Sequence, residues 1–234
     1  MSASPRLFAL VPCAGVGARA GTGGPKQYAS LAGQAVVAHT LAALSQVPRL
    51  TATLVVLAGD DTQFESFAPS FVGERAWVAR CGGADRAESV ANGLRALQGR
   101  GAAERDWVLV HDAARCLVRA GWVDRLIDAC ADDEVGGLLA LPLADTLKSA
   151  NGERVAKTVE RAGKWLAQTP QMFRVGLLAH ALAVAGAEGS AVTDESSAVE
   201  SLGLAPRLVP GELENFKLTW PADFALAARL LETR

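Results

Sequence analysis

Pro12-Cys-Ala-Gly-Val-Gly-Ala-Arg19 is the stretch that decides the fold, and it runs on through Gly21-Thr-Gly-Gly24 to Pro25-Lys-Gln27. The apolar residues 7–11 precede it directly and have the composition of a buried strand. Glycines let a backbone approach a ligand closely, and successive free N–H groups in such a loop bind anions. Arg19 and Lys26 carry the only formal charges in this loop, and both are positive. A strand, a glycine-rich turn and two cations together predict a phosphate-binding loop.

Three kinds of phosphate-binding loop compete for this stretch. A P-loop requires Gly-Lys-Ser/Thr at the start of a helix, whereas Lys26 is followed by Gln27. The segment from Gly15 to Ala20 fits the dinucleotide pattern G-x-G-x-x-A, but that pattern also needs an acidic residue about 20 positions later. No Asp or Glu occurs before Asp60. A nucleoside-triphosphate loop that uses Arg and Lys is the interpretation that remains, with an ordinary solvated turn as its alternative.

Length and composition limit the class of protein. A chain of 234 residues, half of them hydrophobic, predicts one domain over residues 1–234 with a full core. The net charge of −2 argues against a nucleic-acid or anionic-membrane surface. No apolar stretch reaches about 18 residues, and no long apolar region precedes Pro12, so neither a membrane span nor a signal peptide is expected. We expect a small anionic partner, no nucleic acid and no membrane.

The four cysteines are scattered along the chain and form no C-x-x-C pair. This spacing excludes a zinc ribbon and gives no disulfide framework. Reduced, buried thiols in a cytoplasmic protein are the expectation.

Apolar strands and amphipathic helices alternate along the chain. Strands are expected at residues 51–57, 107–111 and 135–141, with a weaker one at 77–79. Helical spacing of apolar residues predicts helices around 36–44, 90–97 and 123–130, the second with Asp85 as its N-cap. This alternation indicates an α/β fold with a single doubly wound, mostly parallel, Rossmann-like sheet. Ligands bind such sheets at the carboxyl ends of the strands, where the glycine-rich loop and Asp112 both lie.

The last third of the chain contains weaker signals. An alanine- and leucine-rich helix extends to about residue 187, and Thr193 is the predicted N-cap of a further helix that begins with two carboxylates. Residues 207–210 and 215–219 are predicted as short strands, and Pro221 as the N1 residue of the last helix.

Residues 144–161 break the alternation. They centre on Asn151-Gly152, which is a strong hairpin signal, and their flanks are polar. An isolated two-stranded hairpin is marginal in water. We therefore expect a protruding arm that a second subunit stabilises, which gives a homodimer; a surface hairpin folded back on its own domain is the alternative.

The charged residues near these segments suggest phosphate chemistry. One carboxylate at a strand end, Asp112, suits Mg²⁺ or another divalent cation, because Mg²⁺ binds through few carboxylates and the phosphates of its substrate. Arg115, Arg161 and Lys217 could hold a second anion. Two phosphates, a metal and surplus positive charge indicate nucleotidyl transfer. The acceptor phosphate is already ionised, so positioning and electrostatic stabilisation suffice without a general base.

Motifs in register along nearly the whole chain resemble the 2-C-methyl-D-erythritol 4-phosphate cytidylyltransferases of the non-mevalonate isoprenoid pathway, which have a nucleotidyltransferase fold. The resemblance starts with the glycine-rich loop and Pro25-Lys-Gln-Tyr28. It continues through Gly82-Gly83, Arg86 and Ser89-Val90, Val110-His-Asp-Ala-Ala-Arg115, Asp145-Thr146, Thr158-Val-Glu-Arg161, Gln168-Thr-Pro-Gln171, Thr193-Asp-Glu195 and Asn215-Phe-Lys217. One such motif would be weak, but this many in order are highly specific.

The resemblance implies transfer of CMP from CTP to methylerythritol phosphate, with release of pyrophosphate. It implies Arg19, Lys26, Arg161 and Lys217 as catalytic residues, the first two at the α-phosphate and the last two at the acceptor phosphate. Nucleotide-binding residues would be Ala14, Gly15, Gly17, Gly82, Ala84, Arg86, Ser89 and Ala113. Acceptor-binding residues would be Asp112, Arg115, Thr146, Thr169 and Thr193, with Asp112 also meeting the metal. The arm would clasp a second subunit, so that Arg161 acts in the neighbouring site.

Three alternatives stay open at this level. Ribitol 5-phosphate cytidylyltransferases share the chemistry and differ in the polyol. A dinucleotide-dependent oxidoreductase would need the missing acidic residue, and a nucleotide-sensing module would bind CTP without turnover. Cys116 also departs from the family pattern, which usually has proline there.

Overall fold

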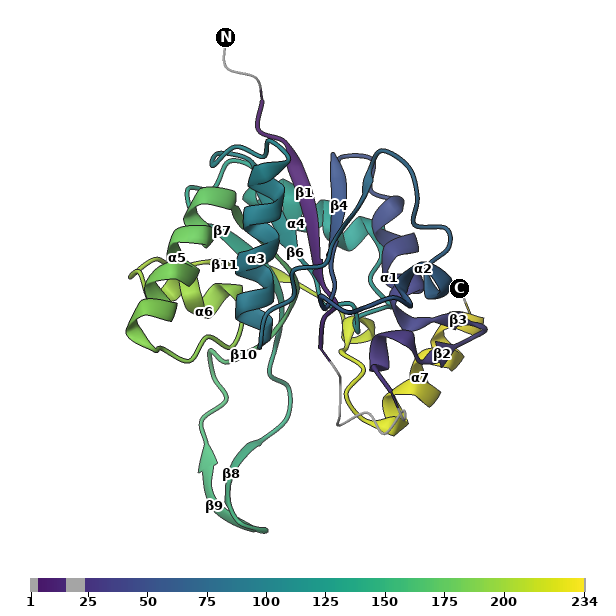
Figure 1. Ribbon diagram of the computed structural model, residues 1–234. Coiled ribbons are helices and arrows are strands. Elements are labelled where there is room, and N and C mark those ends of the chain that lie inside the picture. The colour runs from purple at the N-terminus through teal and green to yellow at the C-terminus, as the bar shows by residue number, and fades with distance from the viewer. Residues whose placement is uncertain (1–3, 16–23, 234) are drawn as a thin grey trace.

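The computed structural model describes residues 4–15 and 24–233, and its centre is a seven-stranded sheet in the order β11-β7-β10-β6-β1-β4-β5 (Figure 1). In chain order these strands are β1 (Leu7–Pro12), β4 (Ala52–Val56), β5 (Ala76–Ala79), β6 (Trp107–Val110), β7 (Gly136–Pro142), β10 (Trp165–Arg174) and β11 (Arg207–Pro210). Strand β1 pairs in parallel with β4 and β6, and β4–β5 and β7–β11 are parallel pairs as well. The predicted α/β fold with a mostly parallel sheet is confirmed.

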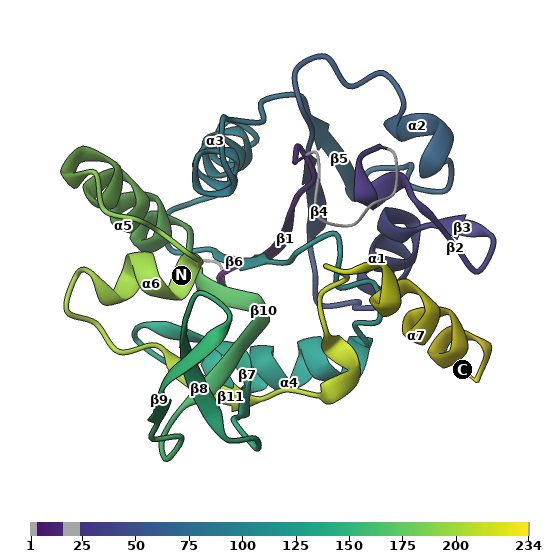
Figure 2. The ribbon, with the colours of Figure 1, turned by 90° about the horizontal axis from the view of Figure 1, so that it is seen from below.

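Helices cover both faces of this sheet (Figure 2). They are α1 (Val36–Ser45), α2 (Phe64–Phe67), α3 (Arg86–Gly99), α4 (Ala120–Cys130), α5 (Val175–Glu188), α6 (Glu195–Glu200) and α7 (Pro221–Glu232), with 3-10 turns η2 (Lys26–Tyr28) and η3 (Leu213–Asn215). Helices α1 and α4 pack on one face, and α3, α5 and α6 on the other. Asp85 is the N-cap of α3, as predicted, and its carboxylate accepts the Glu88 N–H. Pro221 is the first residue of α7, also as predicted.

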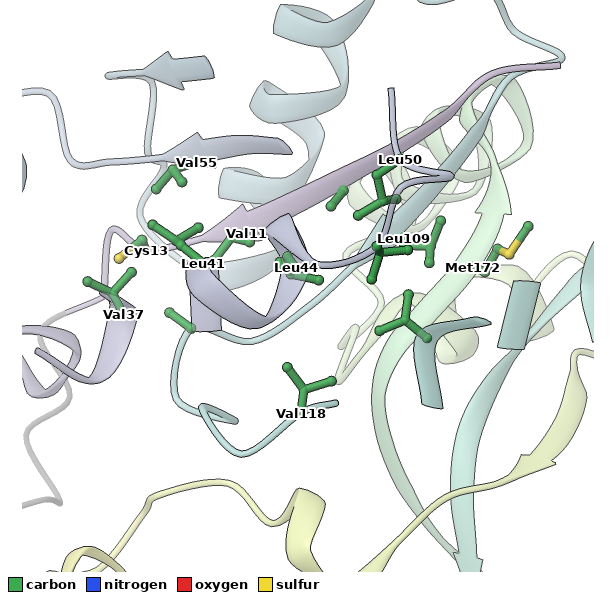
Figure 3. Packing of buried hydrophobic residues seen from close by; sticks show 14 of the residues in the cluster. Val11, Cys13, Val37, Leu41, Leu44, Leu50, Val55, Leu109, Val118 and Met172 are labelled. Carbon is green, nitrogen blue, oxygen red and sulfur yellow. The ribbon is translucent and has the colours of Figure 1, made fainter. Parts of the chain in front are cut away.

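Successive side chains of each buried strand point to opposite faces of the sheet and pack in two separate cores. Ala9 and Val11 of β1 join the core beneath α1 and α4, part of which Figure 3 shows, whereas Phe8 and Leu10 join the core beneath α3 and α5. Because side chains in a strand point alternately to opposite faces, a strand covered on both sides is apolar throughout. The continuous apolar run before the glycine-rich loop is explained by this double burial.

Strand β10 was missed by the sequence prediction. It runs antiparallel to both of its neighbours, β6 and β7, and lies between them. Its middle carries Gln168, Thr169 and Gln171, all buried, so the polar composition hid a strand that lies inside the sheet.

Two local predictions in the last third were wrong. The N-cap of α6 is Asp194, because its carboxylate accepts the Ser197 N–H at 2.9 Å and the Ser197 hydroxyl completes a capping box; Thr193 lies one residue outside. The expected strand at 215–219 does not form. Residues 213–215 make the η3 turn, and 216–219 then run without strand pairing along the edge of a third, smaller core that holds α7.

The predicted hairpin is present and projects away from the sheet as an arm (Figure 1). Strands β8 (Leu147–Asn151) and β9 (Arg154–Val159) pair antiparallel as a separate two-stranded sheet. Gly152 takes φ 58° in the turn, a value that favours glycine. The side chains of both strands are largely exposed, including Val155 at 65%. A second small hairpin, β2 (Ser30–Leu31) with β3 (Gln34–Ala35), precedes α1 and was not predicted.

Cys13, Cys116 and Cys130 are buried free thiols, whereas Cys81 is only partly buried, so the expectation of buried thiols was wrong for Cys81. Among the helices of residues 4–15 and 24–233, none is long and apolar enough to cross a membrane.

Candidate active site

Two adjoining pockets lie at the carboxyl ends of the central strands. The first, of about 350 Å³, is lined by Pro12, Cys13, Ala14, Gly15, Lys26, Gln27, Gly83, Ala84, Asp85, Arg86, Ser89, Asp112, Ala113, Ala114 and Lys217. The second, of about 280 Å³, is lined by Arg86, Asp112, Arg115, Ala167, Gln168, Thr169, Gln171, Thr193, Asp194 and Lys217. Arg86, Asp112 and Lys217 line both pockets, so the two cavities meet at these charges.

Asp112 follows the end of β6 and is the centre of this meeting point. Its Oδ1 accepts from Arg86 Nε at 2.9 Å, and its Oδ2 lies 3.0 Å from Lys217 Nζ and 3.6 Å from Arg115 Nε. Burial by itself raises the pKa of Asp112, but the three cations outweigh it and hold that pKa well below its usual range. The carboxylate is therefore ionised throughout the neutral range.

The Arg86 side chain connects Asp112 to a second buried acid. While Nε donates to Asp112, Nη1 and Nη2 donate to the two carboxylate oxygens of Glu195 at 2.6 and 3.0 Å. Glu195 is only 1% exposed. Burial raises its pKa, and Arg86 opposes that shift. We call Arg86, Asp112, Arg115, Glu195 and Lys217 the charge junction.

A buried hydrogen-bond chain supports Asp112 from the side of the sheet. The Asp112 N–H donates to Thr169 Oγ1 of β10 at 3.0 Å, and that oxygen lies 3.0 Å from His111 Nδ1. Burial lowers the pKa of His111 to about 4, so its ring is neutral at neutral pH. The Thr169 hydroxyl can then donate to Nδ1, which leaves Nε2–H to donate to the Arg115 carbonyl at 3.2 Å. This chain fixes the end of β6 on the neighbouring strand.

Lys26 lies at the downstream end of the glycine-rich loop. Its Nζ donates to the Leu218 carbonyl at 3.0 Å, beside Lys217. The next residue, Gln27, is buried and donates from Nε2 to the Cys13 carbonyl at 3.0 Å. The two ends of the loop are thereby joined, and Lys26 faces the same pocket as Lys217.

The loop before α3 forms the other wall of the first pocket. A Cβ on Gly82 would lie 2.4 Å from the Ala14 Cβ and 2.9 Å from the Leu57 carbonyl oxygen, so only glycine fits there. The Ser89 hydroxyl accepts the Gly83 N–H at 3.0 Å, and the Glu88 carboxylate accepts the Ala84 N–H at 2.7 Å. This loop is held against the start of the glycine-rich loop.

Most of the residues predicted from the sequence come together at these pockets. The first pocket gathers Ala14, Gly15, Lys26, Ala84, Arg86, Ser89, Asp112, Ala113 and Lys217, and the second adds Arg115, Thr169 and Thr193. Gly82 lies against Ala14, as described above. Thr146 and Arg161 belong to the arm segment and line neither pocket. Gly17 and Arg19 lie outside the described residues. The functional roles of all these residues stay predictions.

Sequence reasoning missed the part that Glu195 and Gln27 play. Glu195 was noticed as an acidic residue in the first turn of a helix and as the end of the motif Thr193-Asp-Glu195. No local pattern indicates that it faces Arg86, 109 positions away. Gln27 was quoted only as part of a loop motif. Two observations together could have indicated Glu195. It lies beside the N-cap of α6, and Asp112 alone does not balance the positive charges of Arg86, Arg115 and Lys217.

Comparison with known proteins gives a consistent family. The model of the family described as "IspD: 2-C-methyl-D-erythritol 4-phosphate cytidylyltransferase" matches residues 7–233. The chain belongs to this family. It is therefore a nucleotidyltransferase.

Relatives and solved structures agree with this membership. A 2-C-methyl-D-erythritol 4-phosphate cytidylyltransferase of Burkholderia multivorans is 53% identical over 97% of both chains, and one of Laribacter hongkongensis is 58% identical over 97% of this chain and 96% of its own. A crystal structure of a 4-diphosphocytidyl-2C-methyl-D-erythritol synthase has 40% identity and a TM-score of 0.86, over 98% of this chain and 100% of that one. A bifunctional enzyme IspD/IspF of Albidiferax ferrireducens is 61% identical, and this chain spans only 54% of its length. These names do not favour the ribitol phosphate alternative.

Proposed function

We propose that this chain transfers the CMP group of CTP to 2-C-methyl-D-erythritol 4-phosphate, as its relatives' names state for them. The products are 4-diphosphocytidyl-2-C-methyl-D-erythritol and pyrophosphate, in the non-mevalonate isoprenoid pathway. The observation that carries this proposal is the junction of two pockets at Asp112, Arg86 and Lys217. A reaction that joins two phosphates needs one cavity for each reactant and cations at the place where they meet.

The first pocket is the proposed CTP site. Ala14, Gly15, Gly82, Ala84 and Ser89 are proposed to hold the cytidine, with Gly17, Arg86 and Ala113 completing the nucleotide contacts. Lys26, together with Arg19, is proposed to meet the α-phosphate. The location of Lys26 supports this role, because it lines the first pocket and its ammonium group donates to the Leu218 carbonyl, beside Lys217. An ammonium group there stabilises the negative charge that develops as the phosphoryl group is transferred.

The second pocket is the proposed acceptor site. Lys217, Arg115, Thr169 and Thr193 line this pocket or its rim, and Arg161 and Thr146 of the arm are proposed to add contacts in the neighbouring subunit. An acceptor phosphate oxygen forms the new bond to the α-phosphorus while the bond to the leaving pyrophosphate breaks. The attacking oxygen is already ionised, so no residue needs to remove a proton, and the rate gain comes from alignment and charge stabilisation.

Asp112 suits a divalent cation, such as Mg²⁺, that is bound largely by water and substrate phosphates. Among the described residues, no group of three or more His, Cys, Asp or Glu side chains could hold a metal by itself. Mg²⁺ often binds through one or two carboxylates together with waters and substrate phosphates, and Asp112 offers one such carboxylate between the two pockets. We propose that Asp112 would hold Mg²⁺ brought in with CTP, where the ion would neutralise phosphate charge.

The exposed arm supports a homodimer. A two-stranded hairpin is marginal by itself in water, and among residues 4–15 and 24–233 the two strands of the arm pair only with each other. We propose that the arm, residues 144–161, docks on a second copy of a single-domain chain spanning 1–234. A cytoplasmic location, and the lack of nucleic-acid or membrane partners, stay predictions.

Pyrophosphate release by the purified protein tests the proposed reaction. The assay contains CTP and Mg²⁺ and compares 2-C-methyl-D-erythritol 4-phosphate with ribitol 5-phosphate. Release with the branched substrate alone is the expected result. Release with ribitol 5-phosphate alone would keep the mechanism but contradict the substrate, and no release with either from a folded protein that binds CTP would contradict the function.

A further inference from the structure

Glu195 is a buried charged residue to which the proposed reaction gives no role. Its side chain lines neither pocket, so it does not face a substrate. Both of its carboxylate oxygens accept hydrogen bonds from the end of one guanidinium group, that of Arg86. Whatever Glu195 does in the reaction, it does through Arg86.

The position of Glu195 is fixed from two sides. Asp194, its neighbour, caps α6 and also accepts from Gln171 Nε2 at 2.9 Å. Its other neighbour, Ser196, donates its N–H to Gln171 Oε1 at 2.7 Å. One amide side chain of β10 thus holds the residues on either side of Glu195, and the carboxylate between them is aimed at α3.

The balance of charge around Asp112 explains why a second acid is needed next to Arg86. Asp112 alone faces three cations, Arg86, Arg115 and Lys217. The paired Nη groups of an arginine are well matched to a phosphate, and Arg86 lines both pockets. Without Glu195, those Nη groups would be available to a substrate phosphate, and Arg86 would move off Asp112 to reach it.

We propose that Glu195 is a positioning residue for the transfer reaction, which keeps Arg86 on Asp112 and away from the substrate phosphates. Lys217 then remains the junction cation that meets the acceptor. This inference rests on the function proposed above, and it assigns to Arg86 a task of holding Asp112 in addition to its predicted nucleotide contact.

Glu195→Gln is the direct test, because it removes the charge and keeps the size. We expect kcat to fall about a hundredfold, since small misplacements of reacting groups have effects of that order, while KM for CTP changes less than about threefold. The matched control is Glu200→Gln on the same helix, whose carboxylate accepts from Ser196 and lies outside both pockets; its kcat should equal that of the wild type.

A double-mutant cycle separates positioning from a general structural effect. If Glu195 acts through Arg86, the variant Arg86→Gln/Glu195→Gln should have the same kcat as Arg86→Gln alone, within about threefold. Independent contributions would instead multiply, and that outcome overturns the proposal. Wild-type kcat for Glu195→Gln also overturns it.

The pH dependence supplies a readout that a structural role would not move. Glu195 contacts Arg86 of α3, and the negative charge of Asp112 after β6 acts on it through space. The adjacent carboxylate of Asp194 accepts from Gln171. Protonation removes the charge of Glu195, as the Glu195→Gln substitution does. The ratio of wild-type kcat to Glu195→Gln kcat should therefore fall towards one as the pH is lowered. Titration of the substrates affects both enzymes equally and cancels in that ratio. A ratio that does not change with pH contradicts the proposal.

Two further measurements keep the test decisive. If Glu195→Gln does not fold, Glu195→Asp is tested instead, because it keeps the negative charge on a side chain shorter by one methylene. Its kcat should fall at least about tenfold, with KM for CTP unchanged. An unchanged kcat for Glu195→Asp overturns the proposal. Wild-type turnover is measured alongside. Its absence contradicts the proposed function, whereas an active wild type with a fully active Glu195→Gln contradicts only this inference.

Discussion

The charge junction and the arm are both rich in charge, but they differ in every other respect. The junction draws its five charged residues from α3, α6, the loop after β6 and the 216–219 segment, and its two acids are almost fully buried. The arm exposes most of its side chains, and in the described part of the chain its strands pair only with each other. Ion pairs gain strength when water is excluded and lose it when exposed. The junction is therefore preorganised within one chain, whereas the arm would gain fixed surroundings from the second copy proposed above.

The largest expected effect comes from Asp112→Asn at the centre of the junction. Loss of this carboxylate removes the shared anionic partner of Arg86, Arg115 and Lys217. We therefore expect the free energy of unfolding to fall by about 4 kcal/mol, and we expect no measurable turnover. Urea unfolding and pyrophosphate release measure the two effects.

The control for Asp112→Asn is Asp128→Asn, which removes an exposed partner of Arg49. Its cost should stay below about 1 kcal/mol. Equal costs for the two variants would contradict the view that the buried junction is the stronger network.

Removal of the end of the arm, residues 149–154, is the next test. We expect monomers with an intact body and low activity, because the deleted turn contributes nothing to the two main cores. Sedimentation velocity and far-UV circular dichroism check association and folding. A wild-type protein that sediments as a monomer would refute the role assigned to the arm.

Mixed dimers sharpen the same comparison. Arg161→Ala and Lys217→Ala are each expected to be inactive. When the two variants are unfolded together and refolded, about a quarter of the wild-type activity should return, since a two-fold dimer with shared sites regains one complete site per mixed pair. No recovery in a sample shown to contain mixed dimers would place Arg161 in the site of its own chain.

The smallest effect concerns His111, directly beneath the junction, and is confined to acidic pH. Burial lowers its pKa from 6.5 to about 4, so the unfolded chain takes up a proton before the folded one does. The stability contribution is complete above pH 6.5 and is lost as pH falls towards 4, by at most roughly 3 kcal/mol. Urea unfolding at several pH values should show this loss in the wild type and not in His111→Gln; an equal slope in both would contradict it.

Much of this molecule could be predicted from local patterns. Residues 7–11 and 107–110 are apolar without interruption because both faces of their strands are covered. Asn151-Gly152 marks a turn whose geometry depends on those residues alone. Lys26 was found as a cation of the glycine-rich loop, and Asp112 as a carboxylate at a strand end. The loop and Asp112 both follow strands, and the ends of parallel strands meet at one edge of the sheet.

The features that were missed depend on residues far apart in the chain. The polar segment Gln168-Thr-Pro-Gln171 lies inside the sheet because its side chains bond to Asp194, Asn215 and the backbone at Glu212, and none of these partners is local. The pairing of Glu195 with Arg86 has the same origin. The segment 215–219 has the composition of a strand, yet the α7 core holds it away from any sheet edge.

The route of the chain around β10 has a consequence for protein engineering. Strand β7 leads out into the arm, and β10 returns from it to the middle of the sheet, where Thr169 bonds the Asp112 amide. The arm is thus an insertion between two paired strands, and not an appendage at a terminus. Exchange of arms between homologous enzymes, to make dimers that reject each other, must keep the register of β7 with β10. A shift there would carry Thr169 away from the backbone amide of Asp112 that it bonds.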